Sequence, residues 1–285
     1  MTITIGIAGM TSKFARLLTN ALLKYDDVKI HGLARTPSKL PESIYSSEKV
    51  TIFEGDAFNK ESITFFAHGC DVIVCCYLGD NTLMVSGQKI LIDTCEELSI
   101  PRYIASDWAL EYTRLQLGEL FPKDPMIKIK AYLETKERVA GVHILIGGFM
   151  EPVLSPFFNI FDSKTNTFRF WGEGDEIMEG TTYGNAAEFT AAVARDEGAR
   201  GVIKFLGGRA TIREIAHSFE RVYGVEAKLE SRGSLDDLYE TMHERREENP
   251  EDVFSYLEMY DGPFAFASFS NFFYLTFFGP VVGEY

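Results

Sequence analysis

The sequence predicts an α/β protein, in which a doubly wound parallel sheet is covered by helices and followed by a smaller α+β lobe. Three observations predict it. Residues 2–22 contain a strand, a glycine turn and an amphipathic helix. Strand and helix patterns then alternate as far as residue 146. The predicted strand at residues 71–77 is apolar throughout, as is typical of a strand that a parallel sheet buries on both faces.

The opening segment is the most informative one. Residues 2–8 are β-branched and apolar and predict a strand, Gly9 begins a tight turn, and apolar residues recur at helical spacing from Phe14 to Leu22. A strand that turns sharply into a helix directs several backbone N–H groups at one point, where a phosphate can bind. The segment therefore predicts a nucleotide site.

The elements that follow continue the alternation. Further strands are predicted at residues 28–34, 50–54, 71–77, 102–106 and 142–146, and helices at residues 61–68, 82–98 and 126–140. Parallel sheets of this kind bind their ligands at the carboxyl ends of the strands. We therefore expect the site where the predicted strands end.

In the second half of the chain, the predicted strands and helices no longer alternate regularly. We expect strands at residues 168–171 and 202–206, helices at residues 185–195 and 235–248, and a helix that begins after Thr211. Glu214, three residues beyond Thr211, completes a capping-box pattern. The expected domains are a nucleotide-binding domain at residues 1–150 and a substrate-binding lobe at residues 151–285, with the strand at 202–206 a candidate to rejoin the main sheet.

Composition limits the class of protein. The chain has 285 residues, 46% of them hydrophobic, enough for one large core or one core and a smaller lobe. A net charge of −14 argues against nucleic acid or an anionic membrane as partner. The four cysteines show neither metal spacing nor a disulfide framework, and no secretory signal opens the chain. We expect a cytoplasmic protein without a metal site.

The last segment, residues 264–283, is uncharged and rich in Phe and Tyr. Its length meets the threshold for a membrane-spanning segment, but its polar residues and the acidic flanks Asp261 and Glu284 argue against one. We favour a pocket wall, or an apolar face covered by a second copy in a homodimer.

The glycine turn resembles a phosphate-binding loop with one departure. The three positions of a G-x-x-G-x-x-G pattern are occupied by Gly9, Ser12 and Ala15, so that a side chain stands at the second position. Arg35 ends the second predicted strand and Lys39 follows it. A cation there suits a 2′-phosphate and favours NADP(H) over NAD, and the alternative is a solvated loop arginine.

Several motifs in order resemble those of a known family. They are the turn at residues 9–15, GLAR at 32–35, EGD at 54–56, GCDV at 69–72, YLG at 77–79, RYIASDW at 102–108, KAYLE at 130–134 and GFME at 148–151. Over residues 3–260 the chain resembles the NmrA-like and isoflavone-reductase-like group of atypical short-chain dehydrogenases. That group has a Rossmann-type fold and includes both reductases and dinucleotide-sensing regulators.

The resemblance implies NADPH lying across the strand ends. The residues it implies for cofactor binding are Gly9, Met10, Thr11, Ser12, Lys13, Phe14, Arg35, Lys39, Asp56, Ala57, Tyr77, Leu78, Gly79 and Lys130. For substrate binding it implies Trp108, Phe149 and Met150.

The candidate catalytic residues are Lys130, Ser106 and Asp107. Ordinary short-chain dehydrogenases pair a tyrosine with a lysine four residues later, and here Met126 stands four residues before Lys130. Isoflavone-reductase-type enzymes are understood to use the lysine alone, which can donate a proton or stabilise an oxyanion. Asp107 or a nearby tyrosine is a candidate relay, and Lys128 is an alternative to Lys130 because it is close in sequence. The alternatives are that Lys130 only binds the ribose or pairs with Glu134, and that Ser106 caps the next segment. We expect no functional partner for the five histidines.

Three functions remain open. The first is an NADPH-dependent reductase of a small, largely apolar and aromatic metabolite. The second is an NmrA-like regulatory protein that senses a dinucleotide without catalysis and binds a protein partner through its acidic surface. The third is a non-redox isomerase or cyclase in which Lys130 and Asp107 perform acid–base work.

Overall fold

The computed structural model describes residues 2–155 and 158–248. The chain divides into two compact units. Of the described residues, the first unit contains 2–108, 112–145 and 183–205, and the second contains 109–111, 146–155, 158–182 and 206–248. Each unit is described by itself.

A seven-stranded sheet forms the first unit, in the order β11-β6-β5-β4-β1-β2-β3. Its strands are β1 (Ile3–Ala8), β2 (Val28–Ala34), β3 (Val50–Glu54), β4 (Val72–Cys75), β5 (Arg102–Ile104), β6 (Ala140–Leu145) and β11 (Gly201–Lys204). Every neighbouring pair is parallel. The strand order reverses between β1 and β4, the position where a sheet of this type forms its ligand crevice. The predicted doubly wound sheet is confirmed.

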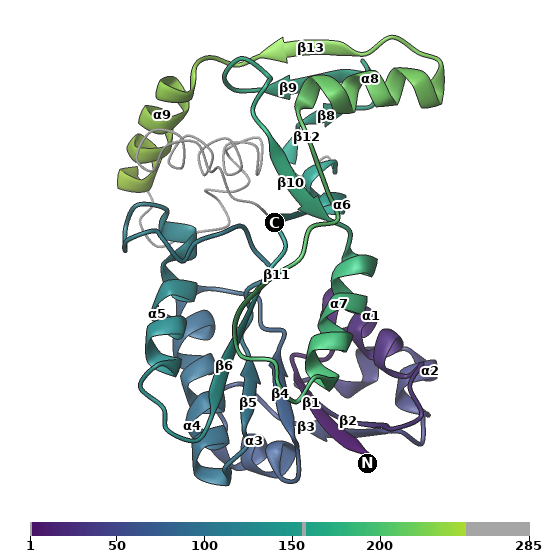
Figure 1. Ribbon diagram of the computed structural model, residues 1–285, viewed down its shortest axis with the longest axis vertical. Helices are drawn as coiled ribbons and strands as arrows, with labels where there is room; N and C mark the ends of the chain where they lie inside the picture. Colours follow the sequence, from purple (N-terminus) through teal and green to yellow (C-terminus); the bar gives the residue numbers. More distant parts are fainter. Residues whose placement is uncertain (1, 156–157, 249–285) are drawn as a thin grey trace. The chain divides into compact units, whose positions relative to one another are not determined.

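Helices cover both faces of this sheet (Figure 1). The α1 helix (Lys13–Leu22), α2 (Glu42–Tyr45) and α7 (Tyr183–Arg195) lie on one face, and α3 (Lys60–Ala67), α4 (Gln88–Leu98) and α5 (Asp124–Leu133) lie on the other. The short segments η1 (Pro37–Lys39), η2 (Thr82–Gly87) and η3 (Phe121–Lys123) complete the unit. The predicted stripe of α1 is confirmed, since Phe14, Leu18 and Leu22 are buried against the sheet.

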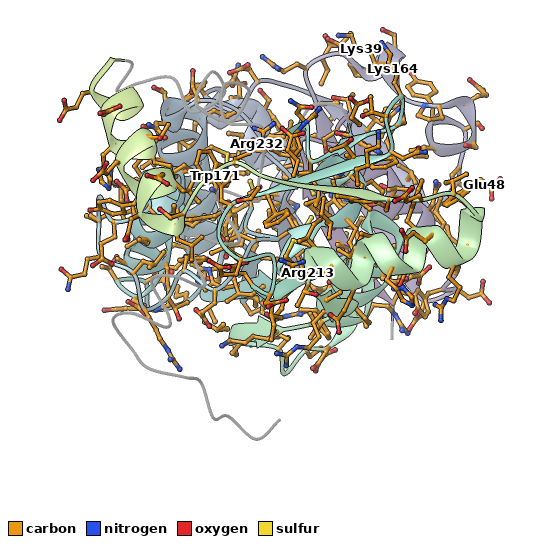
Figure 2. All side chains as sticks on the ribbon, turned by 90° about the horizontal axis from the view of Figure 1, so that it is seen from above. Lys39, Glu48, Lys164, Trp171, Arg213 and Arg232 are labelled. Atoms are coloured by element: carbon orange, nitrogen blue, oxygen red, sulfur yellow. The ribbon has the colours of Figure 1, made fainter. Side chains whose placement is uncertain are left out.

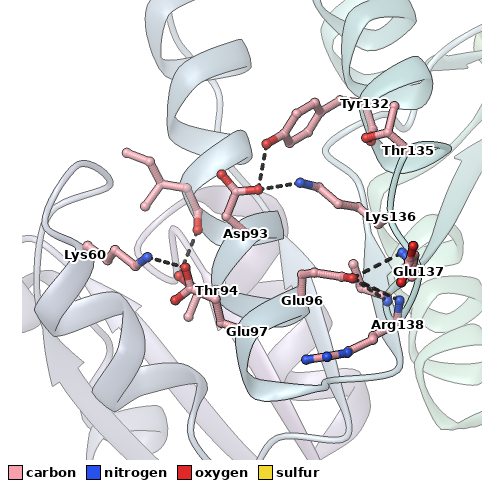
Figure 3. A network of polar contacts seen from close by, with 12 residues as sticks. Lys60, Asp93, Thr94, Glu96, Glu97, Tyr132, Thr135, Lys136, Glu137 and Arg138 are labelled. Carbon is pink, nitrogen blue, oxygen red and sulfur yellow. Dashed lines mark hydrogen bonds and ion pairs between the residues drawn. The ribbon is translucent and has the colours of Figure 1, made fainter.

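The helix predicted at residues 126–140 is wrong in its second half. The α5 helix ends at Leu133, and a turn leads into β6 at Ala140. Figure 3 shows the cause: the Glu96 carboxylate on α4 accepts the backbone N–H groups of Glu137, Arg138 and Val139 at 3.0–3.2 Å. Glu96 thus fixes these N–H groups outside a helix, a long-range contact that the local sequence does not reveal.

The helix predicted at residues 82–98 forms in two parts. The first, η2, is π-helical, and α4 continues from Gln88. The wider turns follow directly on the loop after β4. Such π-helical turns are frequent near functional sites.

The described residues of the second unit form two small sheets and three helices. The sheets have the orders β12-β10-β7 and β13-β9-β8. The strands are β7 (Gly148–Phe149), β8 (Phe161–Asp162), β9 (Thr167–Phe170), β10 (Met178–Thr181), β12 (Gly208–Ala210) and β13 (Lys228–Ser231), and the helices are α6 (Met150–Val153), α8 (Ile212–Tyr223) and α9 (Leu235–Glu248). The predicted smaller α+β region is confirmed.

Aromatic packing holds the second unit together. The rings of Phe161, Phe168 and Phe219 contact one another with centroids 4.6–5.4 Å apart. The predicted capping box at the start of α8 is present, with Thr211 and Glu214 satisfying each other's backbone N–H groups. Trp171, which is labelled in Figure 2, has its ring next to Gly233.

Residues 264–283 lie outside the described residues. Among the helices that the structure does describe, none combines the length and the apolar character needed to cross a membrane.

Candidate nucleotide-binding and catalytic site

The turn after β1 is built by a glycine that no other residue can replace without strain. Gly9 has φ +78°, in the left-handed region. A Cβ atom at this position would lie 2.9 Å from the carbonyl oxygen of Cys76 and 3.1 Å from the Tyr77 ring. The glycine therefore lets the carboxyl ends of β1 and β4 approach closely on the two sides of the switch point.

Ser12, the departure from the glycine pattern, is the N-cap of α1. Its Oγ accepts the backbone N–H of Ala15 at 3.2 Å. The serine side chain is thus folded back onto its own helix, so that it caps the helix at the position where a glycine was expected. Lys13 begins α1, and its Nζ lies 4.5 Å from the centre of the Tyr183 ring on α7.

Three of the predicted ligand-contacting side chains are committed to the interior. Met10 is fully buried, and its sulfur fills the space beside Gly32 on β2. The ring of Phe14 lies 4.3 Å from that of Trp108, whose Nε1 donates to Thr190 Oγ1 at 2.8 Å. Trp108 has a left-handed φ of +38°, a strained value for such a residue. The turn therefore offers its backbone, rather than these side chains, to a ligand.

The residues after β2, β3 and β4 gather near one another. Arg35 is exposed at the end of β2, and Asp56 is half-buried after β3. Tyr77 follows β4, and its ring is buried. Burial raises the pKa of the Tyr77 hydroxyl, as do Cys75 and the Asp56 carboxylate, while the Arg35 guanidinium lowers it. Both charges therefore lie within electrostatic reach of the same hydroxyl.

The Tyr77 hydroxyl has no hydrogen-bond partner within the described residues. A buried polar group without a partner costs about 1–3 kcal/mol. A ligand that brings a polar group to this point would remove that cost. Together with the Gly9 turn and the exposed Arg35, the unpartnered hydroxyl fits a nucleotide.

The remaining predicted cofactor residues surround this point. Ala57 is buried close to Gly87, Leu78 is 77% exposed, and Gly79 leaves room for the Leu83 side chain. Lys39 is exposed in η1 and lies at the outer edge of the view in Figure 2.

Ser106 joins the ends of two strands. Its Oγ donates to the carbonyl oxygen of Tyr77 at 2.6 Å, and its backbone N–H donates to Oε1 of Gln88 at 3.1 Å. Gln88 in turn accepts from the Tyr103 hydroxyl at 3.1 Å. Ser106 therefore fixes the backbone of Tyr77 through its carbonyl group.

Asp107 is the centre of a buried polar cluster. Its Oδ2 lies 2.7 Å from His143 Nδ1 and accepts the Tyr112 hydroxyl at 2.9 Å. The side chains of Asp107 and His143 are 1% and 4% exposed. The sequence reasoning did not place His143 in this cluster. A polar residue within the otherwise apolar strand β6 is the signal that could have found it.

Lys123, which ends η3, lies within the electrostatic reach of this cluster. The Lys123 side chain is half-buried. The surrounding protein disfavours the charged ammonium and lowers the pKa of Lys123 to about 8, while the Asp107 carboxylate acts in the opposite direction. A lysine with such a pKa can exchange a proton near neutral pH. The sequence reasoning missed Lys123 because it followed the spacing of a tyrosine–lysine pair.

The structure does not bring Lys130 into this cluster. Its Nζ forms an ion pair with Glu134, one turn further along α5. The pairing was one of the two alternatives raised from the sequence. Phe149 and Met150 lie in the second unit, where both are half-buried and the Met150 side chain packs beside Gly180. No group of side chains that could hold a metal is found among the described residues.

Comparison with known proteins identifies the domain. A family model described as NAD(P)H-binding matches residues 9–143. No curated protein sequence matches the chain. Residues 9–143 are therefore similar to an NAD(P)H-binding family, as expected.

Solved structures share the fold of the whole chain. An isoflavone reductase is 17% identical, with a TM-score of 0.76 over 100% of this chain and 91% of its own. Leucoanthocyanidin reductase from Vitis vinifera, in complex with NADPH, is 17% identical, with a TM-score of 0.70 over 99% of this chain and 89% of its own. An NADPH-dependent quinone oxidoreductase from Escherichia coli, in complex with NADPH, is 15% identical, with a TM-score of 0.73 over 94% and 90%. The predicted resemblance to isoflavone-reductase-like proteins is confirmed at the level of the fold.

Proposed function

We propose that this chain, an isoflavone-reductase-like protein whose residues 9–143 match the NAD(P)H-binding family, is an NADPH-dependent reductase of a small, largely apolar substrate. The observation that carries the proposal is the buried, unpartnered Tyr77 hydroxyl beside Asp56 and Arg35 at the switch point of the sheet. The reductase structures with the same fold, two of them in complex with NADPH, support the choice of chemistry.

Arg35 and Lys39 would select the phosphorylated cofactor. Both are exposed after β2, where a 2′-phosphate would stand. A guanidinium can bind a phosphate through two parallel hydrogen bonds, which makes this contact specific as well as favourable. The backbone from Gly9 to Phe14 would hold the pyrophosphate at the start of α1, and Asp56, Ala57, Tyr77, Leu78 and Gly79 would line the rest of the crevice.

Bound NADPH would supply a hydride, and the chain must supply a proton. Two lysines are candidates for the proton donor. Lys123 acts near Asp107 and has a pKa of about 8, which suits proton transfer near neutral pH. Lys130, the donor expected from the family, would have to leave Glu134 first. We therefore favour Lys123, with Asp107 as the group that holds its charge.

A small aromatic substrate fits the relatives, which include proteins crystallised with pinoresinol or named for isoflavone and quinone. Phe149 and Met150 remain proposed substrate contacts, whereas the buried Trp108 ring, which packs on Phe14, supports the site from within. We further propose that the protein is cytoplasmic, that its ligand is a small molecule and not a nucleic acid, and that it forms a homodimer, which size-exclusion chromatography with light scattering would test.

Thermal unfolding with each nicotinamide cofactor tests the proposal. A ligand at 100 times its dissociation constant stabilises the folded state by about 2.7 kcal/mol. We expect NADPH to stabilise at much lower concentration than NADH, and Arg35→Ala to remove the difference. Lys29→Ala, which removes an exposed cation at the start of the same strand, is the matched control. Stabilisation by neither cofactor would overturn the proposal.

A second function is favoured by one observation. Met126 stands where a tyrosine is usual, and Lys130 is held by Glu134, so the family's proton donors are missing or engaged. A dinucleotide-sensing regulator needs neither. NADPH binding without turnover of quinones or flavonoid-type substrates would favour the regulator. Turnover that is lost in Lys123→Ala but kept in Lys130→Ala would favour the reductase with Lys123 as proton donor. A product of unchanged oxidation state would instead point to an isomerase or cyclase.

A further inference from the structure

An open groove runs along one edge of the seven-stranded sheet. The edge strand is β3, which pairs with β2 on one side and with no other strand of the described chain. The groove lies between β3 and α3 and has a volume of about 480 Å³. Among the described residues, none of those proposed for the cofactor lines it. It is therefore a separate feature of the first unit.

The backbone of β3 presents hydrogen-bonding groups that point away from the sheet. The Ile30 N–H donates to the carbonyl oxygen of Lys49 at 2.8 Å, and the Gly55 N–H donates to that of Ala34 at 3.1 Å. Because the direction of bonding alternates along a parallel strand, the odd-numbered residues face β2, and Ile52 turns its N–H and carbonyl groups outward. No described residue bonds to these two groups of Ile52. The strand can therefore accept a further strand.

The sequence of β3 lacks the residues that protect edge strands. Edge strands commonly carry lysine, proline or a bulge, which prevent pairing with another chain. Residues 50–54 read VTIFE, without lysine or proline, and pair with β2 in continuous register over all five positions. The strand at the other edge, β11, ends in Lys204. The β3 edge is thus open in sequence as well as in structure.

Phe65 forms the apolar wall of the groove. Its side chain is 64% exposed, whereas that of the next residue, Phe66, is fully buried in the core. Glu61 and Ser62 precede Phe65 by four and three residues, so the three side chains share one face of α3, and this face lines the groove. An exposed phenylalanine beside an open strand edge offers an anchor to an apolar side chain of an added strand.

The wall is fixed close to the end of β3 by specific contacts. A Cβ on Gly55 would lie 2.5 Å from the Ser62 Cβ, so the glycine permits the close approach of α3. The Asn59 side chain caps α3 by accepting the Ser62 N–H at 3.1 Å. The groove therefore has a built shape.

The two charged side chains that line the groove are both acidic. Glu54 ends β3 and Glu61 lies in the first turn of α3, and both are exposed. Within residues 2–155 and 158–248, neither carboxylate has an ion-pair partner. Lys60, the cation next to Glu61 in the chain, is paired with Glu97 on α4 instead. Basic side chains of a partner would therefore find two carboxylates to neutralise.

We propose that this groove binds an extended segment of a partner protein, which adds to β3 as a further strand. The segment places an apolar side chain against Phe65 and brings lysine or arginine to Glu54 and Glu61. Its backbone bonds to the outward groups of Ile52 and supplies affinity, while its apolar and basic side chains supply specificity. This inference does not rest on the proposed reductase activity.

Charge argues against a second copy of this chain as the occupant. In an antiparallel pairing of two β3 strands centred on Ile52, the cation brought toward Glu54 would be Lys49. The Lys49 ammonium already donates to the Tyr25 carbonyl oxygen at 3.0 Å and lies 3.2 Å from Asp26 Oδ1. A second copy would also bring its own acidic groove to the same edge, where like charges repel. The charges favour a basic segment of another protein.

The probe is a peptide of about nine residues, long enough to span β3. Lysine alternates with valine, one central valine is replaced by phenylalanine, and both ends are blocked. Fluorescence anisotropy of the labelled peptide measures binding at about 150 mM salt, which screens general attraction to an acidic protein. We expect a dissociation constant of about 100 µM or lower.

Two control peptides separate backbone pairing from charge. N-methylation of every second amide removes the donors toward β3 and keeps every side chain, and it should weaken binding at least about tenfold. Glutamate in place of lysine keeps the backbone and reverses the charge, and it should abolish binding.

Protein variants locate the peptide. Phe65→Ala should weaken binding about tenfold, and Glu61→Gln about threefold. Ile52→Pro removes the outward N–H and leaves the ladder to β2 in place, so it should weaken binding about tenfold. Tyr223→Ala, which removes an exposed ring of α8, and Glu137→Gln, which removes an exposed carboxylate before β6, are the matched controls and should leave the affinity unchanged.

Three results would overturn the proposal. They are no binding at about 1 mM peptide, equal binding of the N-methylated peptide, and equal affinity of Phe65→Ala and wild type. A homodimer that Ile52→Pro dissociates would assign the edge to a second copy and overturn it as well. If Ile52→Pro unfolds the protein, the N-methylated peptide decides, because it leaves the protein unchanged.

Discussion

The close approach at Gly9 can be measured by one substitution and its control. Gly9→Ala places a non-glycine residue at φ +78°, which costs about 1–2 kcal/mol. It also places a Cβ 2.9 Å from the Cys76 carbonyl oxygen, a backbone atom that cannot rotate away. Overpacking of this kind costs about 1–3 kcal/mol. We expect the free energy of unfolding of the first unit to fall by about 2–5 kcal/mol.

Gly69→Ala separates the two contributions. Gly69 has φ +77°, almost the same as Gly9, but an added Cβ there meets nothing within 4 Å. It should therefore lose only the conformational part, about 1–2 kcal/mol. Urea unfolding gives both values for the same unit, and NADPH binding should be weakened by Gly9→Ala alone. Equal destabilisation by the two substitutions, within about 0.5 kcal/mol, would refute the role assigned to the close approach.

Three further predictions concern buried groups. Lys123→Met should raise the free energy of unfolding at pH 7 by about 3 kcal/mol, because the pKa of the folded lysine is about 8 against an ordinary 10.5. Between pH 8 and pH 10.5 the folded wild type binds fewer protons than its unfolded chain, so the free energy of unfolding of the wild type rises with pH there. The difference between variant and wild type should therefore disappear above pH 10.5. Urea unfolding of both proteins at pH 7 and above pH 10.5 measures it. Gly32→Ala places a Cβ 1.8 Å from the Met10 sulfur and should lower the free energy of unfolding, measured by thermal unfolding, by about 1–3 kcal/mol. In a Met10→Ala background the same substitution should lower it by almost nothing, and an equal loss in the two backgrounds would contradict this packing. Tyr77→Phe should stabilise the NADPH-free protein by about 1 kcal/mol and weaken NADPH binding about fivefold by calorimetry, whereas a loss of stability would show that the hydroxyl has a partner.

The first unit was predictable because its signals are local. The stripe from Phe14 to Leu22 and the apolar run of β4 follow from periodicities that any buried helix or strand must have. In the second unit, β13 was missed because all four of its residues are exposed and show no alternation. The end of α5 was misjudged because Glu96, some forty residues earlier in the chain, fixes the loop after it.

The candidate site divides in the same way. The Gly9 turn and Arg35 could be placed from the sequence, since each is defined by its position at the end of one strand. The Asp107–His143–Tyr112 cluster could not, because its members lie 36 and 5 residues from Asp107 and meet only through the pairing of β5 with β6. From the sequence, Ser12 was a departure from the glycine pattern, and the structure shows that its side chain caps α1.

Each of the two units contains one tryptophan, so intrinsic fluorescence can report on each unit. The chain has two tryptophans, and Trp108 lies in the first unit while Trp171 lies in the second. Because Trp108 touches Phe14 at the start of α1, its emission senses the crevice, and Trp171 beside Gly233 senses the other core. Replacing either indole by Phe leaves a protein with a single fluorophore, so the melting of each half can be followed separately, without any attached dye.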